Sequence, residues 1–257
     1  MEEGTSLIPF SDAEHTRHSF PVVNVALISL NVLVFLYELS LSGIGFLEGE
    51  KIRLFFLTWG LIPQELTGGE PFISVSAGAR ILSIETPLPT WTTIFSSMFI
   101  HGGFMHLIGN MMFLWVFGDN IEGGMGHLKY LGFYLAAGVV ATLSHVAIDP
   151  SSQAPLVGAS GAISGVLGVY LLLYPYNHVK ALVVMYFITV VQLPAMVLLG
   201  FWFGLQVLNG LGSLGMSSGV NVAFFAHVGG FVAGLLVAAA YKVVTRQPIW
   251  PPKPHRV

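Results

Sequence analysis

Residues 158–175 read GASGAISGVLGVYLLLYP, an apolar stretch in which glycine recurs at positions 158, 161, 165 and 168. Small residues spaced by three and four positions share one face of a helix and let neighbouring membrane helices approach closely. Two hydroxyl side chains, Ser160 and Ser164, interrupt the stretch. The pattern predicts a closely packed transmembrane helix and leaves open what Ser160 does at its start.

The composition of the whole chain is that of a membrane protein. Of its 257 residues, 54% are hydrophobic and 9% are charged, whereas soluble domains carry about 25% charged residues. The net charge of −3 and the lack of a dense basic run argue against a nucleic-acid partner. Because the chain has no cysteine, disulfides, thiolate catalysis and zinc–thiolate or iron–sulfur sites are excluded.

Apolar windows long enough to cross a bilayer occur at residues 22–42, 104–119, 129–148, 158–175, 194–210 and 225–244. We therefore predict an all-α membrane protein with a six-transmembrane-helix domain over residues 21–245. Residues 1–20 lack the features of a secretory signal and are expected to be a cytoplasmic polar tail, with a second cytoplasmic tail over 246–257. The apolar piece 181–192 is assigned to the membrane interface, and Pro194 to the first turn of the fifth helix.

The loops and the positive charges predict how the chain is arranged across the membrane. In the long first loop, Ile52, Phe55, Phe56 and Trp59 recur at helical spacing, which predicts an interfacial helix. The Gly- and Ser-rich residues 210–221 predict a mobile loop. Lysines and arginines favour one side of the membrane, which predicts that both termini are cytoplasmic; the residues on that side are Arg17, Lys129, Lys180, Lys242, Arg246, Lys253 and Arg256. No organelle-targeting segment is visible, so the bacterial inner membrane is the default location.

Polar side chains from distant segments are expected to meet at one depth. The second, fourth and sixth helices are all expected to begin at the outer face. Near their starts lie His106 and Asn110 in the second helix, Ser160 in the fourth and His227 in the sixth. Polar groups at membrane depth usually face the bundle interior or a water-filled cavity. An imidazole can accept the proton of a serine and make it a nucleophile, so Ser160 and His227 are candidate nucleophile and base. His106 and Asn110 share a helix face, and with the backbone N–H groups that start the fourth helix they can donate to an oxyanion.

The sequence offers no carboxylate as a third member of this site. Asp119 and Glu122 lie about 20 Å or more beyond His106 along the helix, and Asp149 precedes a proline and is interpreted as a turn residue. A Ser–His dyad is therefore expected, and Glu122 is expected to cap or bond a neighbouring segment. Two imidazoles make a poor zinc site, so no metal is expected.

Each of these residues has a simpler interpretation when taken alone. Ser160 alone would be a small packing residue, His227 an interhelical hydrogen-bonding residue and Asn110 a structural one. Their shared depth favours catalysis. Ser164 is assigned to packing, and two other histidines, His101 and His145, to structural or interfacial roles.

Three motifs resemble those of the rhomboid intramembrane serine proteases, in family order and over roughly residues 20–245. They are HGGFMHLIGN at 101–110, GASG at 158–161 and AHVGGFVAG at 226–234. The resemblance implies that Ser160 is the nucleophile, His227 the general base, and His106 and Asn110 the oxyanion-stabilising residues, with no metal or cofactor. It also implies cleavage of single-span membrane proteins near the outer face through an acyl-enzyme, with transmembrane substrates and membrane lipids as partners. The loop before the sixth helix would act as a cap, and the fifth helix would lie near the substrate entrance.

Two positions depart from the family pattern, and two other functions stay open. Thr92 follows Trp91 where many members have arginine, and Ser164 stands where some members stack an aromatic ring on the catalytic histidine. Other packing must therefore orient His227. A non-catalytic member that binds membrane clients is disfavoured by the intact Ser160 and His227. A small transporter is disfavoured because charged residues near the bilayer centre and inverted halves are not found.

Overall fold

The computed structural model describes residues 6–12, 20–42, 46–68, 72–77, 80–184, 188–214 and 223–253. Within these ranges the long helices coincide with the apolar windows: α1 (Val22–Leu41), α5 (Phe104–Met125), α6 (His127–Ile148), α7 (Ser160–Leu173), α8 (Ala195–Ser213) and α9 (Phe224–Val244). Arg17, Arg256 and residues 215–221 of the expected mobile loop lie outside the described residues. Residues 210–213 of that loop are the last turn of α8.

The prediction of six full spans holds only in part. By length and hydropathy, four helices can each cross a membrane: α1, α6, α8 and α9. A fifth span results if α5 is joined to the short helical turns of Thr90–Phe99, from which it is bent by 82°. Helix α7 has 14 residues and is shorter than a full crossing.

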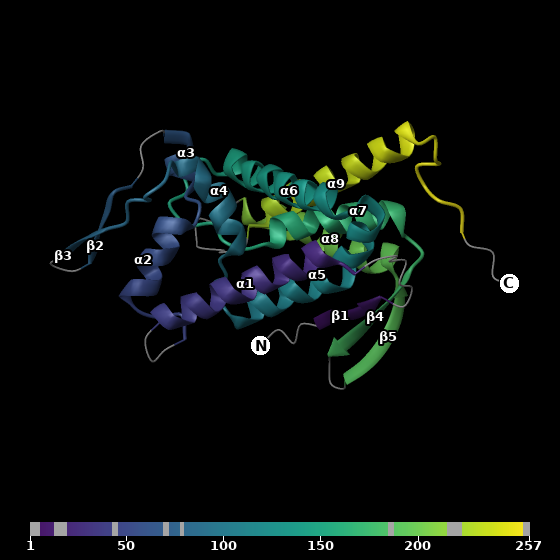
Figure 1. Cartoon of the computed structure of the whole chain (residues 1–257), viewed down its shortest axis with the longest axis horizontal. Helices are drawn as coiled ribbons and strands as arrows, with labels where there is room; N and C mark the ends of the chain where they lie inside the picture. The colour runs from purple at the N-terminus through teal and green to yellow at the C-terminus, as the bar shows by residue number, and fades with distance from the viewer. Residues whose placement is uncertain are drawn as a thin grey trace.

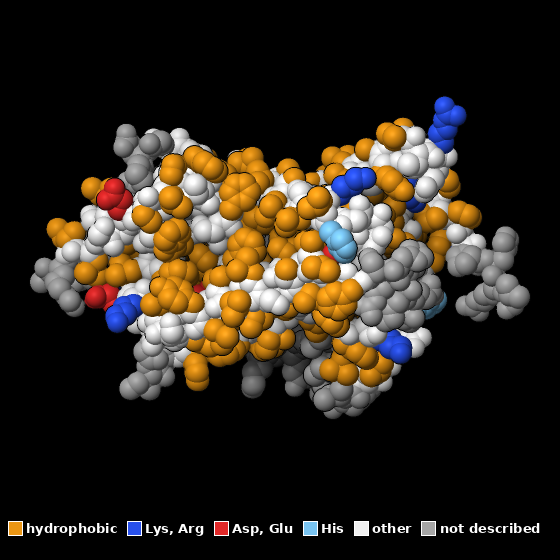
Figure 2. Space-filling view, in the orientation of Figure 1, with side chains coloured by type: hydrophobic (Ala, Val, Ile, Leu, Met, Phe, Trp, Pro, Cys, Tyr) orange, Lys and Arg blue, Asp and Glu red, His pale blue; other side chains and the backbone are white. Residues whose placement is uncertain are grey.

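The helices run along the long axis of the molecule, and the loops gather at its ends (Figure 1). One end carries the first-loop elements α2 (Glu50–Trp59), α3 (Pro63–Gly68) and the hairpin of β2 (Ser74–Ala77) and β3 (Arg80–Ser83); the loop then returns through η1 (Thr90–Thr92), α4 (Thr93–Ser96) and η2 (Ser97–Phe99). The helix predicted from the spacing of Ile52 and its apolar neighbours is α2. Figure 2 shows hydrophobic side chains over the flank of the bundle and charged side chains toward its two ends, as expected for a protein surrounded by lipid.

The other end of the bundle carries a three-stranded antiparallel sheet in the order β1 (Ser6–Asp12), β4 (His178–Val184), β5 (Ile188–Pro194). One prediction is corrected here: residues 1–20 are not only a tail, because Ser6–Asp12 pairs with β4. The described residues of the apolar piece 181–192 belong to the paired strands β4 and β5. Pro194 ends β5 and directly precedes α8. The β-branched composition of 178–194 favours strand pairing.

Buried polar groups connect the sheet and the helices at this end. Asp12 accepts hydrogen bonds from Asn120 Nδ2 (2.8 Å) and from the Tyr170 hydroxyl, which fastens β1 to α5 and α7. The Glu122 carboxylate accepts the N–H groups of Val23 (2.9 Å) and Asn24 (2.7 Å), so it caps the first turn of α1. This confirms that Glu122 bonds a neighbouring segment.

Helix α7 lies inside the bundle, and its most extensive helix contact is with α9. A side chain added at Gly230 or Gly234 of α9 would collide with the backbone carbonyl of Gly161 or Gly165 of α7, so the two backbones touch. On another side, a Cβ at Gly161 would lie 2.7 Å from the Ala141 Cβ of α6. The glycine stripe predicted in residues 158–168 therefore sets how closely α7 packs between α6 and α9.

Candidate active site

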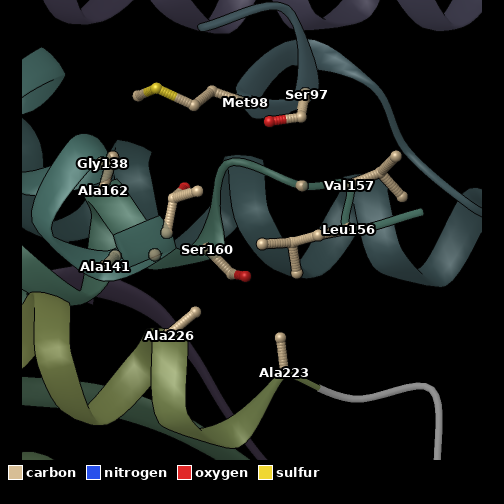
Figure 3. Close-up of a pocket in the computed structure, with 13 residues that line it drawn as sticks. Ser97, Met98, Gly138, Ala141, Leu156, Val157, Ser160, Ala162, Ala223 and Ala226 are labelled. Atoms are coloured by element: carbon tan, nitrogen blue, oxygen red, sulfur yellow. The ribbon is translucent and has the colours of Figure 1, made fainter. Parts of the chain in front are cut away.

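The close packing of α7 and α9 brings Ser160 and His227 together. Ser160 is the first residue of α7, and His227 lies in the first turn of α9. The distance between Ser160 Oγ and His227 Nε2 is 2.7 Å, a hydrogen bond of ordinary length. In Figure 3 the Ser160 hydroxyl points toward the start of α9, marked by Ala223 and Ala226. The pair expected from the sequence is thus in direct contact.

The other face of His227 is occupied by α8. His227 Nδ1 lies 2.8 Å from Gln206 Oε1, and the ring of Trp202, one helical turn earlier, lies 6.0 Å from the imidazole between centroids at an interplanar angle of 37°. Sequence reasoning did not find these residues because it searched for a carboxylate and for an aromatic ring at position 164. Their i, i+4 spacing in an otherwise apolar helix was the available signal.

The candidate oxyanion residues lie on one face of α5. Asn110 Nδ2 donates to the carbonyl oxygen of His106 at 2.9 Å. The Gly102 N–H donates to His106 Nδ1 at 3.4 Å, so Nδ1 is the acceptor and Nε2 carries the hydrogen of the neutral ring. His106 therefore presents an N–H donor on the side of the ring away from Gly102.

Gly158 lets this ring approach the start of α7. A Cβ at position 158 would lie 2.8 Å from both His106 Nε2 and His106 Cε1. The φ angle of Gly158 is +126°, a conformation that L-residues rarely adopt. The Gly158 N–H donates to the carbonyl of Ser97 at 2.8 Å, which fixes the loop before Ser160. The turn therefore needs glycine for both its conformation and its contact with His106.

A small cavity of about 20 Å³ adjoins Ser160, and its volume is enough for one water molecule. It is lined by the loop of Leu156–Gly158, by small residues of α6 and α7, and by Ala223 and Ala226 (Figure 3). The first backbone N–H groups of α7, like those of any helix, have no acceptor within their own helix. The site thus combines a hydroxyl, an imidazole, several N–H donors and space for water.

The remaining polar residues of the sequence motifs surround this centre. Ser164 Oγ donates to the carbonyl of Ser160 at 2.6 Å, and its side chain is buried in the bundle. His101 is fully buried, and its ring lies 5.1 Å from that of His106 between centroids. The backbone N–H of His101 donates to Glu38 Oε1 at 3.1 Å. These contacts agree with packing and structural roles for Ser164 and His101.

An apolar helix bundle that holds a serine–histidine hydrogen bond at two helix starts defines a multi-pass membrane protein with a polar site among its helices. The family model of the Rhomboid domain matches residues 89–243, which is more than half of the chain. The chain therefore belongs to the rhomboid family, and it is an integral, multi-pass membrane protein.

The curated relatives include bacterial and plant proteins. The chain is 29% identical over 192 residues to rhomboid protease GluP of Bacillus subtilis, covering 74% of this chain and 33% of that protein. It is 26% identical over 254 residues to rhomboid protease AarA of Providencia stuartii, covering 92% of this chain and 79% of that protein. A third relative, RHOMBOID-like protein 5 of Arabidopsis thaliana, is 36% identical over 81 residues, covering 32% of this chain and 26% of that protein. The chain thus spans only about a third of GluP and less of the plant protein.

Proposed function

We propose that this protein is an intramembrane serine endopeptidase in which Ser160 is the nucleophile and His227 the general base. The hydrogen bond of 2.7 Å between Ser160 Oγ and His227 Nε2 carries this proposal. It joins a hydroxyl to an imidazole that can accept its proton, within an apolar bundle where polar groups are otherwise costly. The names of GluP and AarA as rhomboid proteases support the same class of activity.

The chemistry follows from the contact. His227 Nε2 takes the Ser160 proton as Oγ attacks the scissile carbonyl carbon, and the carbonyl electron pair moves onto oxygen to form an oxyanion. The imidazolium then gives its proton to the leaving nitrogen as the C–N bond breaks, which leaves an ester on Ser160. Water attacks this acyl-enzyme with His227 again accepting a proton, and the carboxyl product departs as Ser160 regains its hydrogen.

Three kinds of donor are proposed to stabilise the oxyanion. His106 contributes Nε2–H, because its Nδ1 accepts from Gly102. The backbone N–H groups at the start of α7 contribute fixed donors, and Asn110 supports the group through its hydrogen bond to the His106 carbonyl or through its second amide hydrogen. The cavity beside Ser160 offers room for the hydrolytic water.

The substrates are proposed to be single-span membrane proteins, cut near the outer face. In this proposal residues 21–245 form the six-helix catalytic domain. Helix α7, the fourth of these six in chain order, counts as a membrane segment although it is short, and α2 lies in the membrane interface. Strand β1 and the described part of the C-terminal tail lie at the same end of the bundle, which supports placing these two segments on one side of the membrane (Figure 1). We place that side in the cytoplasm and the protein in a bacterial inner membrane, with membrane lipids as its other partners and no metal or nucleic acid.

The test is cleavage of a single-span model substrate by purified protein in lipid vesicles. Ser160→Ala and His227→Ala should each abolish cleavage, while the matched control Ser164→Ala, one helical turn away from Ser160, should retain most of it. Wild type, but not Ser160→Ala, should react with a serine-directed fluorophosphonate. Cleavage by Ser160→Ala would overturn the nucleophile assignment. A wild type that binds the substrate but neither cuts it nor labels would instead indicate a non-catalytic client-binding protein.

A further inference from the structure

Helix α8 contacts His227 through more than one side chain. Gln206 Oε1 lies 2.8 Å from His227 Nδ1, and the Trp202 ring lies beside the imidazole. Trp202 and Phe203 also pack on Phe231 of α9, with ring centroids 6.0 Å and 4.4 Å apart, the second pair being stacked. Because Phe231 follows His227 by one helical turn, these contacts fix α8 against the part of α9 that carries the histidine.

We propose that Gln206 is a positioning residue that holds His227 with its proton on Nδ1 and its Nε2 lone pair directed at Ser160. An amide oxygen can only accept a hydrogen bond, so a contact between Oε1 and Nδ1 requires hydrogen on Nδ1. Nε2 is then the acceptor that the Ser160 hydroxyl needs. The inference rests on the proposed function and adds a third member, a neutral amide, to the expected dyad.

The reverse orientation of the amide would stop the reaction. If the Gln206 NH₂ group faced His227, Nδ1 would be the acceptor, Nε2 would carry the hydrogen, and it could not take the Ser160 proton. Trp202 limits rotation of the ring on the same side. The amide oxygen therefore selects one of two tautomers.

A neutral amide also suits this location. When His227 accepts the Ser160 proton, both ring nitrogens carry hydrogen, and the bond from Nδ1–H to Gln206 Oε1 becomes charge-assisted. A carboxylate in the same place would have to stay ionised among apolar helices, which is unfavourable without further partners. Gln206 provides the acceptor without a permanent charge.

The experiment compares three variants of α8 in the whole 257-residue chain. Gln206→Met keeps the length of the side chain and removes the amide oxygen; Gln206→Glu keeps an oxygen acceptor. Asn209→Leu is the matched control, because it removes an exposed amide from the same helix. The readouts are kcat and KM for the model single-span substrate, the rate of fluorophosphonate labelling, the melting temperature, and the ¹⁵N spectrum of the His227 ring, assigned by comparison with His227→Ala.

Gln206→Met should lower kcat and the labelling rate by about 10- to 100-fold, the range expected for losing a hydrogen bond to a charged group. KM should stay within about twofold, and the ¹⁵N spectrum should lose the pure Nδ1–H form. Gln206→Glu should recover part of the labelling rate, and Asn209→Leu should match wild type. Equal rates for Gln206→Met and Asn209→Leu would overturn this inference but not the proposed function. So would a joint loss of activity and melting temperature in both Gln206→Met and Gln206→Glu, because it would indicate a purely structural role. A wild type that does not label overturns the proposed function, and the inference falls with it.

Discussion

The substitution Gly161→Ala tests whether helix packing sets the distance between Ser160 and His227. The new Cβ would lie 2.7 Å from the Ala141 Cβ of α6, whereas ordinary contacts begin at 3.4 Å, so α6 and α7 must separate locally by about 0.7 Å. Gly161 is next to Ser160, whose hydrogen bond to His227 is 2.7 Å long. A displacement of about 0.7 Å along this bond would already bring it near 3.4 Å, the limit of useful geometry, so the pair tolerates only a small part of the shift.

We therefore expect Gly161→Ala to lower the free energy of unfolding by about 1–3 kcal/mol, as overpacking does, and to slow cleavage by at least about tenfold. Adding Ala141→Gly removes the opposing Cβ and should restore most of both. Thermal melting in detergent and single-span cleavage measure the two effects. Gly132→Ala, at an open helical position of α6, is the control and should be neutral. Wild-type rates for Gly161→Ala, or no recovery in the double variant, would refute the reasoning.

Two other predictions address the neighbouring contacts. Gly158→Ala should reduce cleavage strongly, because position 158 has φ +126° and its new Cβ would lie 2.8 Å from the His106 ring. Gly103→Ala, which has open space around its new Cβ, is the control for this rate measurement. Equal cleavage rates for the two variants would contradict the assigned contact. Glu122→Ala should lower the free energy of unfolding by about 1–3 kcal/mol through loss of the cap on α1, measured by thermal melting, with little change in KM. An unchanged melting temperature would show that the cap is dispensable.

Hydropathy located the membrane helices because each such helix satisfies its own backbone hydrogen bonds within one apolar segment. The end of the second helix was missed for a physical reason. The apolar window stops at residue 119, yet α5 continues to Met125. Asn120 and Glu122 lower the local hydropathy, but their side chains bond Asp12 and the start of α1 instead of water. These partners come from distant segments of the chain, so a hydropathy window, which averages over neighbouring residues, does not detect them.

The sheet was not predictable from the same signal. Strand β1 pairs with β4 across more than 160 residues of chain, from Ser6 with Val184 to Asp12 with Val179. Strand register depends on which distant segment supplies the partner, and neither hydropathy nor charge in residues 1–20 identifies it. The polar, partly acidic composition of residues 1–20 is typical of an exposed tail. Asp12 is nevertheless buried, because it is bonded by Asn120 and Tyr170, which are distant in the sequence.

The sequence predicts how far along its helix each site residue lies. It does not predict which neighbouring helix each residue faces. Ser160 and His227 could be paired because both begin helices that start in one layer. Gln206 lies well inside α8, and its direction is set by how Trp202 and Phe203 pack on Phe231. Sequence periodicity gives the relative positions of Trp202 and Gln206 on α8 but not the neighbour that this face meets.

Helix α9, which carries His227, packs more closely on α7 than on α8. Ser160 and His227 are joined by α7 and α9, whose backbones touch at glycines and cannot separate without losing dense packing. Gln206 reaches His227 from α8, which is held to α9 mainly by aromatic side chains and is more exposed along its length. An outward displacement of α8 would therefore break the Gln206 contact while the Ser160–His227 pair stayed in place. Under the proposed mechanism, the hydroxyl and the imidazole would remain together without the acceptor that selects the tautomer, and we expect such a movement of α8 to lower reactivity.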